Sequence, residues 1–525
     1  MKKKLLLILL LLVTVPLQAE ITVWPRSWLV PASHDEIAPR QKADKLLLQA
    51  APGEYEPAVF AVRSDEATTV TVVLSGIVEP GWLPPDWCDI RHVSAREDGK
   101  PAVWLYEIDD AVKLEAGRTE YFWITVRIPD DAAPGIYRGR VYLQAEHQMQ
   151  QVNIECEVLP FRLAKSEITN GMFMADVNLP PGWYADMKIH GIEAVQYFWG
   201  YNARVINDGG RLKMDLSRMD RFMDDLNKAG LDGPVVVSLG NDYHLHYERR
   251  IAEAFGLPLF NRPEIGGKRE LGPEITPQLD SLFVEGLRQI TAHWRDKGWH
   301  QELVILIYDE PTERLLERCK HRYDLLKTAI PDTRVYGVVM NRREWAESML
   351  DQMDIIVANG DFEAMRELAS SHDKDYWVYS GIRGLAQVRF NKGCLPWKVG
   401  ASGAFTWMYN YFSYDPEGCM VIPHPENPQR YLRSVNWETV REGADDLRYF
   451  ATAERLIRNS SSPSARRAEI RLDELKEGIE MSRRSPGELT PDVLDRSELL
   501  AYYNTSQAVR AEVIEIILGL LKDDN

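Results

Sequence analysis

Residues 303–311 read Leu-Val-Ile-Leu-Ile-Tyr-Asp-Glu-Pro, an aliphatic run that ends in two acids and a proline. A run of this kind is typical of a parallel strand that is covered on both faces. Pro311 cannot donate to a ladder and so stops the strand, and a helical pattern follows from about Thr312, which stands in the N-cap position. The acids therefore fall where a strand passes into a helix, the edge of an α/β barrel that carries chemistry.

Asp309 and Glu310 allow two interpretations. Acids that follow a strand are often only the first residues of a helix, where the macrodipole favours them. Two carboxyls held close together also move each other's pKa apart, so that one can act as an acid at neutral pH while the other stays ionised. The rest of the chain decides between these interpretations.

Residues 1–19 are predicted to be a signal peptide. Lys2 to Lys4 form a positive region, residues 5–15 an apolar core too short to span a bilayer, and residues 17–19 a cleavage site before Glu20. No other apolar run approaches the length of a spanning helix. We therefore expect an exported bacterial protein, periplasmic or secreted, without a membrane anchor.

The composition limits the classes of substrate, partner and cofactor that the chain is expected to bind. The formal net charge is -17 at pH 7, and an acidic chain repels nucleic acid and anionic membranes, which leaves neutral glycans or peptides as substrates. The 15 Trp and 22 Tyr offer flat faces for stacking on ligand rings. The five cysteines show no CxxC spacing and the histidines no HxxxH or HExxH pattern, so we expect no metal and no organic cofactor.

The chain divides into three predicted domains. Residues 20–163 show short alternating runs between turn residues, as in an all-β sandwich. In residues 164–428 strands alternate with helical patterns, and residues 429–525 are helical. Eight strands of this kind make a (β/α)8 TIM barrel. The predicted strands are 170–177, 194–199, 234–239, 303–308, 334–340, 354–358, 375–379 and 403–407.

In such a barrel the side chains at the carboxyl ends of the strands face one pocket. Here that edge is rich in aromatic, amide and acidic residues, which is the composition that a sugar site requires. The candidate substrate-binding residues are Tyr197, Trp199, Asn341, Asp361, Tyr379, Trp407 and Asn410. The same edge carries Asp176, Asn178, Tyr201, Asn241, Asp242, Asn359, Arg383 and Tyr409.

Several short motifs together resemble glycoside hydrolase family 123 and its wider relatives, exported bacterial proteins with a sandwich, a barrel and a helical tail. Each motif is short, but their order and spacing extend over nearly all of the mature chain. The motifs are Gly53-Glu54-Tyr55-Glu56-Pro57, residues 134–139, Tyr308-Asp309-Glu310-Pro311, the run from Gly384 to Trp407, and Arg441-Glu442-Gly443 with Asp446 and Tyr449.

The resemblance implies a retaining β-N-acetylgalactosaminidase with substrate-assisted catalysis. Glu310 would be the general acid, and Asp309 would hold the acetamido group, whose oxygen attacks the anomeric carbon; this departs from the usual pair of opposed carboxylates. A tyrosine donor to the acetamido oxygen is expected, for which we choose Tyr379, and Trp407 would stack on the sugar. Neighbouring strand residues point to opposite sides, so both acids enter one pocket only if the strand breaks at Asp309.

Two other functions stay open at this point. One is a glycosidase of the same fold for another sugar, which hydrolysis of a glycoside without an acetamido group would reveal. The other is a carbohydrate-binding protein without hydrolytic activity. The intact Asp309–Glu310 pair argues against the second, because a purely structural barrel has no need of two buried acids.

Overall fold

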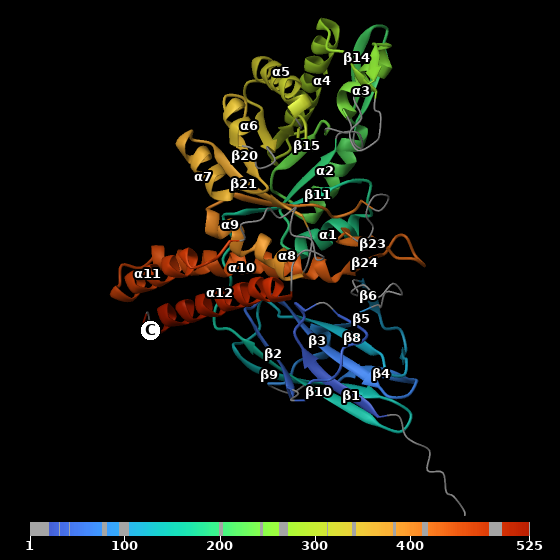
Figure 1. Ribbon diagram of the computed structural model, residues 1–525, viewed down its shortest axis with the longest axis vertical. Coiled ribbons are helices and arrows are strands. Elements are labelled where there is room, and N and C mark those ends of the chain that lie inside the picture. The colour runs from blue at the N-terminus through green and yellow to red at the C-terminus, as the bar shows by residue number, and fades with distance from the viewer. Residues whose placement is uncertain are drawn as a thin grey trace, which may run out of the picture. The chain divides into compact units, whose positions relative to one another are not determined.

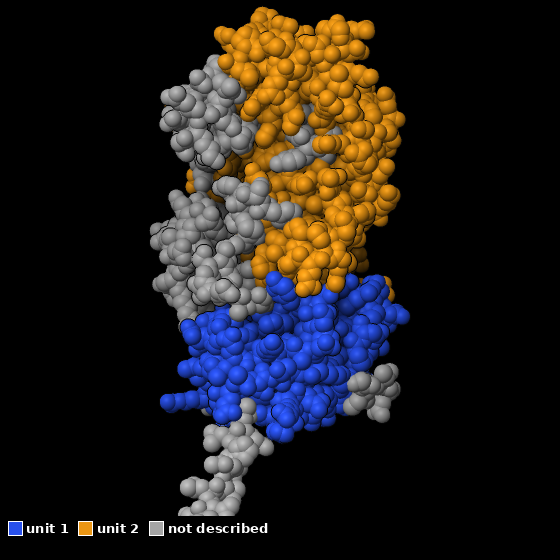
Figure 2. All heavy atoms as spheres, turned by 90° about the vertical axis from the view of Figure 1, so that its right-hand side faces the viewer, with its two compact units in different colours: residues 1–28, 32–102, 106–160 blue, residues 29–31, 103–105, 161–525 orange. Residues whose placement is uncertain are grey.

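The computed structural model falls into two compact units, which Figure 2 distinguishes by colour. One comprises residues 1–28, 32–102 and 106–160, and the other residues 29–31, 103–105 and 161–525. The described residues are 20–30, 32–40, 43–75, 81–93, 104–198, 203–241, 245–261, 271–311, 313–338, 343–381, 385–411, 418–481 and 496–523. The predicted signal peptide lies outside them, and within them no helix has the length and apolar character that crossing a membrane requires.

The first unit is a β-sandwich. Strands such as β9 and β10 bury alternate side chains, whereas β8 is buried at every residue but its last. The apolar side chains of both sheets, among them Phe60, Val141 and Ile154, meet in one core. One sheet contains β1 (Ile21–Arg26), β3 (Tyr55–Ser64), β8 (Thr119–Arg127) and β5 (Cys88–Val93) as neighbours in that order. The other has the order β2 (Lys45–Ala50), β10 (Met149–Val158), β9 (Gly135–Gln144), β4 (Thr68–Leu74) and β7 (Val112–Leu114).

The second unit is built on a closed barrel of parallel strands, which confirms the predicted (β/α)8 fold (Figure 1). All eight predicted strands are present. Their inward side chains, such as Val304, Leu306, Val357 and Phe405, fill the barrel. In order around the barrel the strands are β11 (Thr169–Met174), β12 (Ala194–Phe198), β15 (Val235–Ser238), β18 (Leu303–Leu306), β19 (Arg334–Val338), β20 (Ile355–Ala358), β21 (Asp375–Ser380) and β22 (Gly403–Thr406).

Helices connect these strands around the outside of the barrel (Figure 1). The sequence predicts five of them from helical patterns at residues 215–229, 279–299, 313–329, 342–350 and 362–370. They correspond to α2 (Ser217–Ala229), α4 (Pro277–Asp296), α5 (Glu313–Ala329), α6 (Arg343–Ser348) and α7 (Phe362–Ser371). The patterns did not reveal α1 (Pro181–Ile189), α8 (Leu385–Lys392) and α9 (Cys394–Val399).

Two insertions extend the barrel. A hairpin of β13 (Arg204–Asp208) and β14 (Arg211–Asp215) follows β12. The segment between β15 and α4 contains α3 (His246–Phe255) and the short strands β16 (Leu259–Asn261) and β17 (Leu271–Pro273). The helix α3 is amphipathic and its apolar face is buried, so it packs as an integral part of this unit.

The chain continues through β23 (Val421–Pro423) and β24 (Tyr431–Ser434) into three helices, α10 (Val435–Arg458), α11 (Pro463–Glu477) and α12 (Arg496–Asp523). These helices confirm that the end of the chain is helical, and the N-cap of α11 is Ser462. The Ser462 hydroxyl accepts the Ala465 N–H at 3.1 Å, because Pro463 takes the first helical position.

A buried lysine holds the seam where β22 pairs with β11. Lys392, at the end of α8, donates to the Asn170 Oδ1 at 2.5 Å, the Gly171 carbonyl at 2.7 Å and the Ala404 carbonyl at 2.9 Å. Burial lowers the pKa of this amine. The three acceptors match the three donors of an ammonium group, so the contact ties both strands to the helix.

Gly171 lets the Phe405 ring pack across the same seam, since a Cβ at this position would overlap the ring. We expect Gly171→Ala to lower the free energy of unfolding by about 1–3 kcal/mol through overpacking, as measured by urea denaturation. Gly519→Ala is the control: this residue is exposed on α12 with no heavy atom within 4 Å of its added Cβ. It should stabilise the helix by up to about 1 kcal/mol, and equal effects of the two substitutions would contradict this account.

Candidate active site

The acid pair lies just beyond the end of β18. The ladder stops at Leu306, two residues before the predicted end at Tyr308. Asp309 then rejoins the sheet through a single bridge, in which its N–H donates to the Gly240 carbonyl at 2.8 Å. Glu310 has a φ of 47°, in the left-handed region that non-glycine residues seldom adopt. The backbone therefore leaves the strand conformation at the acids, which is the condition for both carboxyls to enter one pocket.

Both carboxyls occupy surroundings that disfavour charge. Asp309 is 9% exposed, and its Oδ1 has no hydrogen-bond partner among the described residues. Burial raises the pKa of Asp309 well above its usual range, and the Glu310 charge raises it further. Burial also raises the pKa of Glu310, although a hydrogen bond from the Asn359 Nδ2 to its Oε1, at 3.0 Å, acts in the opposite direction. A carboxyl that keeps its proton in this way can serve as a general acid.

Two tyrosines inside the barrel reach toward the acids. Tyr336 on β19 and Tyr379 on β21 both belong to the barrel core. Burial raises the pKa of both hydroxyls, and the charges of Asp309 and Glu310 raise it further. The Tyr336 hydroxyl has no hydrogen-bond partner within the described part of the chain. Both side chains therefore stay neutral and can donate to a ligand.

The sequence reasoning predicted Tyr379 but missed Tyr336. It considered residues at and just beyond the strand ends, whereas Tyr336 lies within β19, two residues before Val338. The sequence feature that could have revealed Tyr336 is a tyrosine at an inward position of a strand that is otherwise aliphatic. Asn359, at the end of β20, was named at the pocket edge but was not chosen as a site residue.

Trp407 follows β22 and provides an aromatic wall. Its ring packs on Phe173 with centroids 4.3 Å apart and meets Tyr411 edge-on at 6.0 Å. The side chain is only half-buried, and the Trp407–Met408 peptide bond is cis. A half-buried indole at the end of a barrel strand is suited to stacking on a sugar ring.

The prediction of Tyr197 as a substrate-binding residue is wrong. Ala194 faces the barrel interior, and because strand residues alternate, Tyr197 faces outward. Its ring packs edge-on against Phe222 of α2, with centroids 5.0 Å apart. Tyr197 was predicted to line the pocket because it lies near the strand end, but the alternation of side chains along the strand directs it outward.

The structure gives Asn410 a structural contact. Its Oδ1 accepts the Ala175 N–H at 3.0 Å and its Nδ2 donates to the Asp176 carbonyl at 2.7 Å, which joins the ends of the last and first strands. Asp361 is exposed and precedes α7 with a φ of 45°. Contact of these two residues with substrate stays a prediction. Trp199, Tyr201, Asp242, Asn341 and Arg383 lie outside the described residues.

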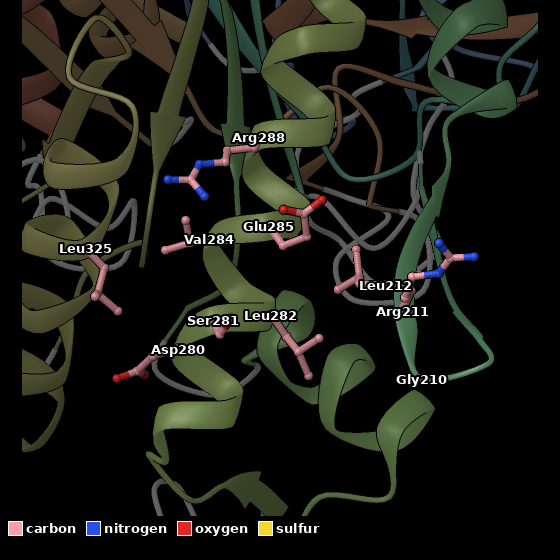
Figure 3. A pocket seen from close by; sticks show the side chains of 10 residues that line it. All are labelled: Gly210, Arg211, Leu212, Asp280, Ser281, Leu282, Val284, Glu285, Arg288 and Leu325. Atoms are coloured by element: carbon pink, nitrogen blue, oxygen red, sulfur yellow. The ribbon is translucent and has the colours of Figure 1, made fainter.

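A hollow of about 530 Å³ lies away from the acids (Figure 3). It is lined by the turn of the β13–β14 hairpin and by α4, with Leu325 of α5 at its edge. The hollow contains no member of the acid pair, so we assign it no part in catalysis.

No group of three or more His, Cys, Asp or Glu side chains in the described ranges is placed to hold a metal ion. None of the five cysteines forms a disulfide, and all except Cys88 are fully buried.

The chain resembles glycoside hydrolases in sequence and in fold. Residues 202–453 match the catalytic domain of glycoside hydrolase family 123. The structure of a family 123 glycoside hydrolase from Clostridium perfringens, analysed for glycolipid glycan hydrolysis, matches with a TM-score of 0.73 and 12% identity over 96% of this chain and 100% of that one. No curated protein sequence matches the chain.

Other solved barrels match over less of the chain. An endo-β-1,4-mannanase from Thermotoga petrophila covers 54% of this chain and 77% of its own at 13% identity, with a TM-score of 0.36. An exo-β-1,4-mannosidase from Opitutaceae bacterium strain TAV5 covers 54% and 61% at 14% identity, with a TM-score of 0.35. Scores this low carry no argument about function.

The matched catalytic domain over residues 202–453 defines the class of this protein: it is a glycoside hydrolase, a class whose substrates are glycans. Within that class the chain is a family 123-like protein, as the order of its motifs predicted.

Asp309→Asn should stabilise the protein at neutral pH. The raised pKa of Asp309 in the folded state means that the folded chain retains a proton which the unfolded chain loses above about pH 4. Stability therefore falls as the pH rises from there toward the folded-state pKa. Asparagine carries no such cost, so the Tm of the variant should exceed that of the wild type by an amount that grows from pH 4.5 to pH 7. A variant that melts below the wild type at pH 7 would contradict the burial argument.

Proposed function

We propose that this enzyme is a retaining β-N-acetylgalactosaminidase whose nucleophile is the acetamido group of its own substrate. One observation carries the proposal: Asp309 and Glu310 are consecutive, buried and electrostatically coupled at one strand end. A retaining enzyme with a protein nucleophile holds its two carboxyls about 5–5.5 Å apart around the scissile bond. Adjacent acids serve better where one donates a proton and the other binds the acetamido group.

Glu310 acts first as general acid. Its proton passes to the glycosidic oxygen as the bond from that oxygen to the anomeric carbon breaks, and the acetamido oxygen forms a bond to that carbon. The products of this step are the free alcohol and an oxazolinium ion. Water then attacks the anomeric carbon, the Glu310 carboxylate takes its proton, and the acetamido oxygen leaves. Two displacements at one carbon retain its configuration.

Asp309 supplies the charge that the oxazolinium ion needs. Its Oδ1 lacks a protein partner among the described residues, so the acetamido N–H can donate to it. That hydrogen bond favours the anion, against the burial that raises the pKa of Asp309. The resulting carboxylate stabilises the positive charge that develops on the acetamido group.

A tyrosine hydroxyl completes the acetamido pocket in this proposal. Tyr379 and Tyr336 both lie within electrostatic reach of the acids. Tyr379 is 7% exposed whereas Tyr336 is 0% exposed, so Tyr379 is the better donor to the acetamido oxygen. Tyr336 supports the wall behind it.

The first measurement compares 4-nitrophenyl β-N-acetylgalactosaminide with 4-nitrophenyl β-galactoside. We expect only the acetamido substrate to be hydrolysed, since the galactoside lacks the nucleophile. Glu310→Gln should lower kcat on a poor leaving group by about 10²–10⁴-fold. Cleavage of the galactoside alone would favour a glycosidase of the same fold for another sugar, and glycolipid glycans, which the Clostridium perfringens enzyme hydrolyses, belong in the panel that follows.

Tyr379→Phe should lower kcat on the acetamido substrate by about 10²-fold, as expected for the loss of one donor to a developing charge. Tyr197→Phe is the matched control, because this ring lies on the outer face of β12 against Phe222. It should leave kcat and KM near wild-type values. Equal losses in the two variants would show that the Tyr379 hydroxyl has no specific part in the reaction.

A further inference from the structure

Behind the acid pair lies a buried cluster of charges that the proposed mechanism does not use. We call it the Glu248 cluster; its members are Glu248 on α3, Asp280 on α4, Tyr308 just beyond β18, and Arg318 and Arg322 on α5. Glu248 is 2% exposed, Tyr308 1% and Arg322 0%. Ions buried this deeply cost several kcal/mol each unless they are fully paired.

The carboxylate of Glu248 is the centre of this cluster. Its Oε1 accepts the Arg322 Nε at 2.8 Å and the Tyr308 hydroxyl, and its Oε2 pairs with Arg318. The Arg318 Nε also donates to the Tyr308 hydroxyl at 3.2 Å. Burial alone would raise the pKa of Glu248, but Arg322 and Arg318 outweigh it and lower the pKa to about 2. Glu248 is therefore an anion at every pH at which a glycosidase works.

The cluster binds Tyr308, the residue that immediately precedes the acid pair. Backbone contacts hold the residues on either side of Tyr308. The Ile307 N–H donates to the Tyr323 hydroxyl at 3.4 Å, and that hydroxyl donates to the Tyr336 carbonyl at 2.8 Å. The Asp309 N–H binds the Gly240 carbonyl at 2.8 Å. Tyr308 lies between these two backbone contacts. Among the acidic groups of the described chain, only the Glu248 carboxylate binds its side chain.

Glu310 needs such support. Its φ of 47° is a strained conformation for a non-glycine residue, and it persists only when the surroundings enforce it. Ile307 and Tyr308 have left the β18 ladder, and Asp309 keeps only a single bridge to the sheet, so the ladder does not fix the conformation of Glu310. Side-chain contacts from α3 and α5 take over this task.

We propose that Glu248 is a positioning residue for the general acid. By holding the Tyr308 hydroxyl it keeps the chain at Glu310 in its left-handed conformation, with the Glu310 proton directed at the leaving oxygen. The inference rests on the proposed function, because it takes Glu310 to be the general acid. It also gives the insertion between β15 and α4 a share in the reaction, since α3 carries Glu248.

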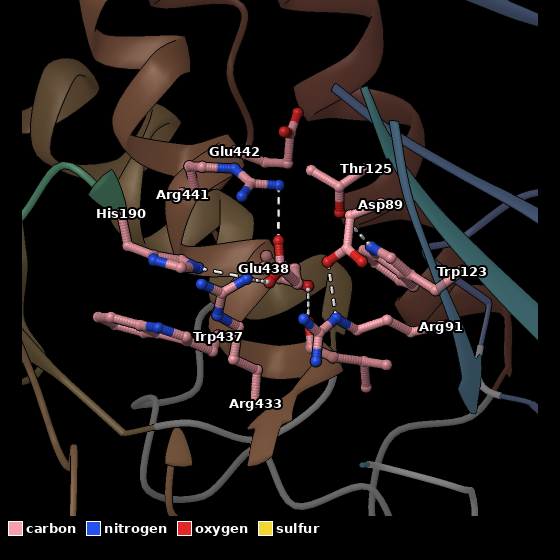
Figure 4. Close-up of polar contacts among 12 residues, drawn as sticks. Asp89, Arg91, Trp123, Thr125, His190, Arg433, Trp437, Glu438, Arg441 and Glu442 are labelled. Carbon is pink, nitrogen blue, oxygen red and sulfur yellow. Dashed lines mark hydrogen bonds and ion pairs between the residues drawn. The ribbon is translucent and has the colours of Figure 1, made fainter. Parts of the chain in front are cut away.

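Glu438 on α10 provides a matched control. It is 1% exposed and is bound by Arg441 at 2.6 Å, by Arg433 and by His190 (Figure 4). Here too burial is outweighed by arginine, and the pKa of Glu438 is lowered. Its partners in Figure 4 include no residue of β18 or of the acid pair. Glu438→Gln therefore reports what the loss of a buried, arginine-paired carboxylate does to stability alone.

The test uses Glu248→Gln, which keeps the volume, and Tyr308→Phe, which removes only the hydroxyl and serves if the first variant does not fold. Each is assayed on methyl and 4-nitrophenyl β-N-acetylgalactosaminides, because a poor leaving group depends on the general acid and a good one hardly does. We expect kcat on the methyl glycoside to fall by about 10–100-fold, kcat on the nitrophenyl glycoside by less than about 3-fold, and KM to stay constant. Glu438→Gln should lower the Tm without a difference between the substrates.

The outcomes separate the two proposals. In one outcome the effect of Glu310→Gln on kcat depends on the leaving group, whereas Glu248→Gln and Tyr308→Phe change kcat on both substrates by the same factor, as Glu438→Gln does. The positioning role is then overturned and the proposed function stands. If the wild type hydrolyses neither substrate, or Glu310→Gln shows no dependence on the leaving group, the proposed function is overturned and the role of Glu248 with it.

Discussion

Two acids on consecutive residues can share a pocket only where the chain leaves the strand conformation between them. In this enzyme the β18 ladder stops at Leu306 and Glu310 adopts a left-handed backbone. Tyr308 contacts α3 and α5, while both acids lie within electrostatic reach of Tyr336 and Tyr379 in the barrel core. The barrel supplies the rigid surroundings in which this irregular segment keeps one shape. The chemistry, the support behind it and the insertion that carries Glu248 all follow from that break.

The buried acids of the protein have two opposite kinds of electrostatic surroundings. Glu248 and Glu438 are bound by arginines that keep them charged. Within the described part of the chain Asp309 has no basic partner of this kind, and its Oδ1 has no hydrogen-bond partner there. A buried acid that is fully paired holds the fold together, whereas one that is left without a partner is costly until a ligand provides it. This contrast is the physical reason for assigning chemistry to Asp309 and support to Glu248.

Much of the fold could be predicted because its signals are local. The aliphatic runs located all eight barrel strands, and the acid pair followed directly from the strand that carries it. The helix α8 was missed because all of its residues are buried, polar ones such as Gln387 and Asn391 included, so no amphipathic pattern exists to be read. Tyr197 was assigned wrongly and Tyr336 was overlooked for one reason, since the direction of a strand side chain depends on counting residues from an inward neighbour. The Glu248 cluster could not be predicted, because its other members lie 32 to 74 residues from Glu248 along the chain and meet only in space.

The lysine at the barrel seam has a consequence for how the chain folds as it is made. Lys392 binds Asn170 across 222 residues of sequence, and β22 is the neighbour that covers the free side of β11. During synthesis β11 therefore emerges long before the strand that completes it, and it keeps an open edge until residues beyond 403 have left the ribosome. Contacts so distant in sequence form slowly, and an uncovered parallel edge invites pairing with other chains. The interval between the synthesis of the first and the last strand is thus the period in which the open edge of β11 is exposed to pairing with other chains.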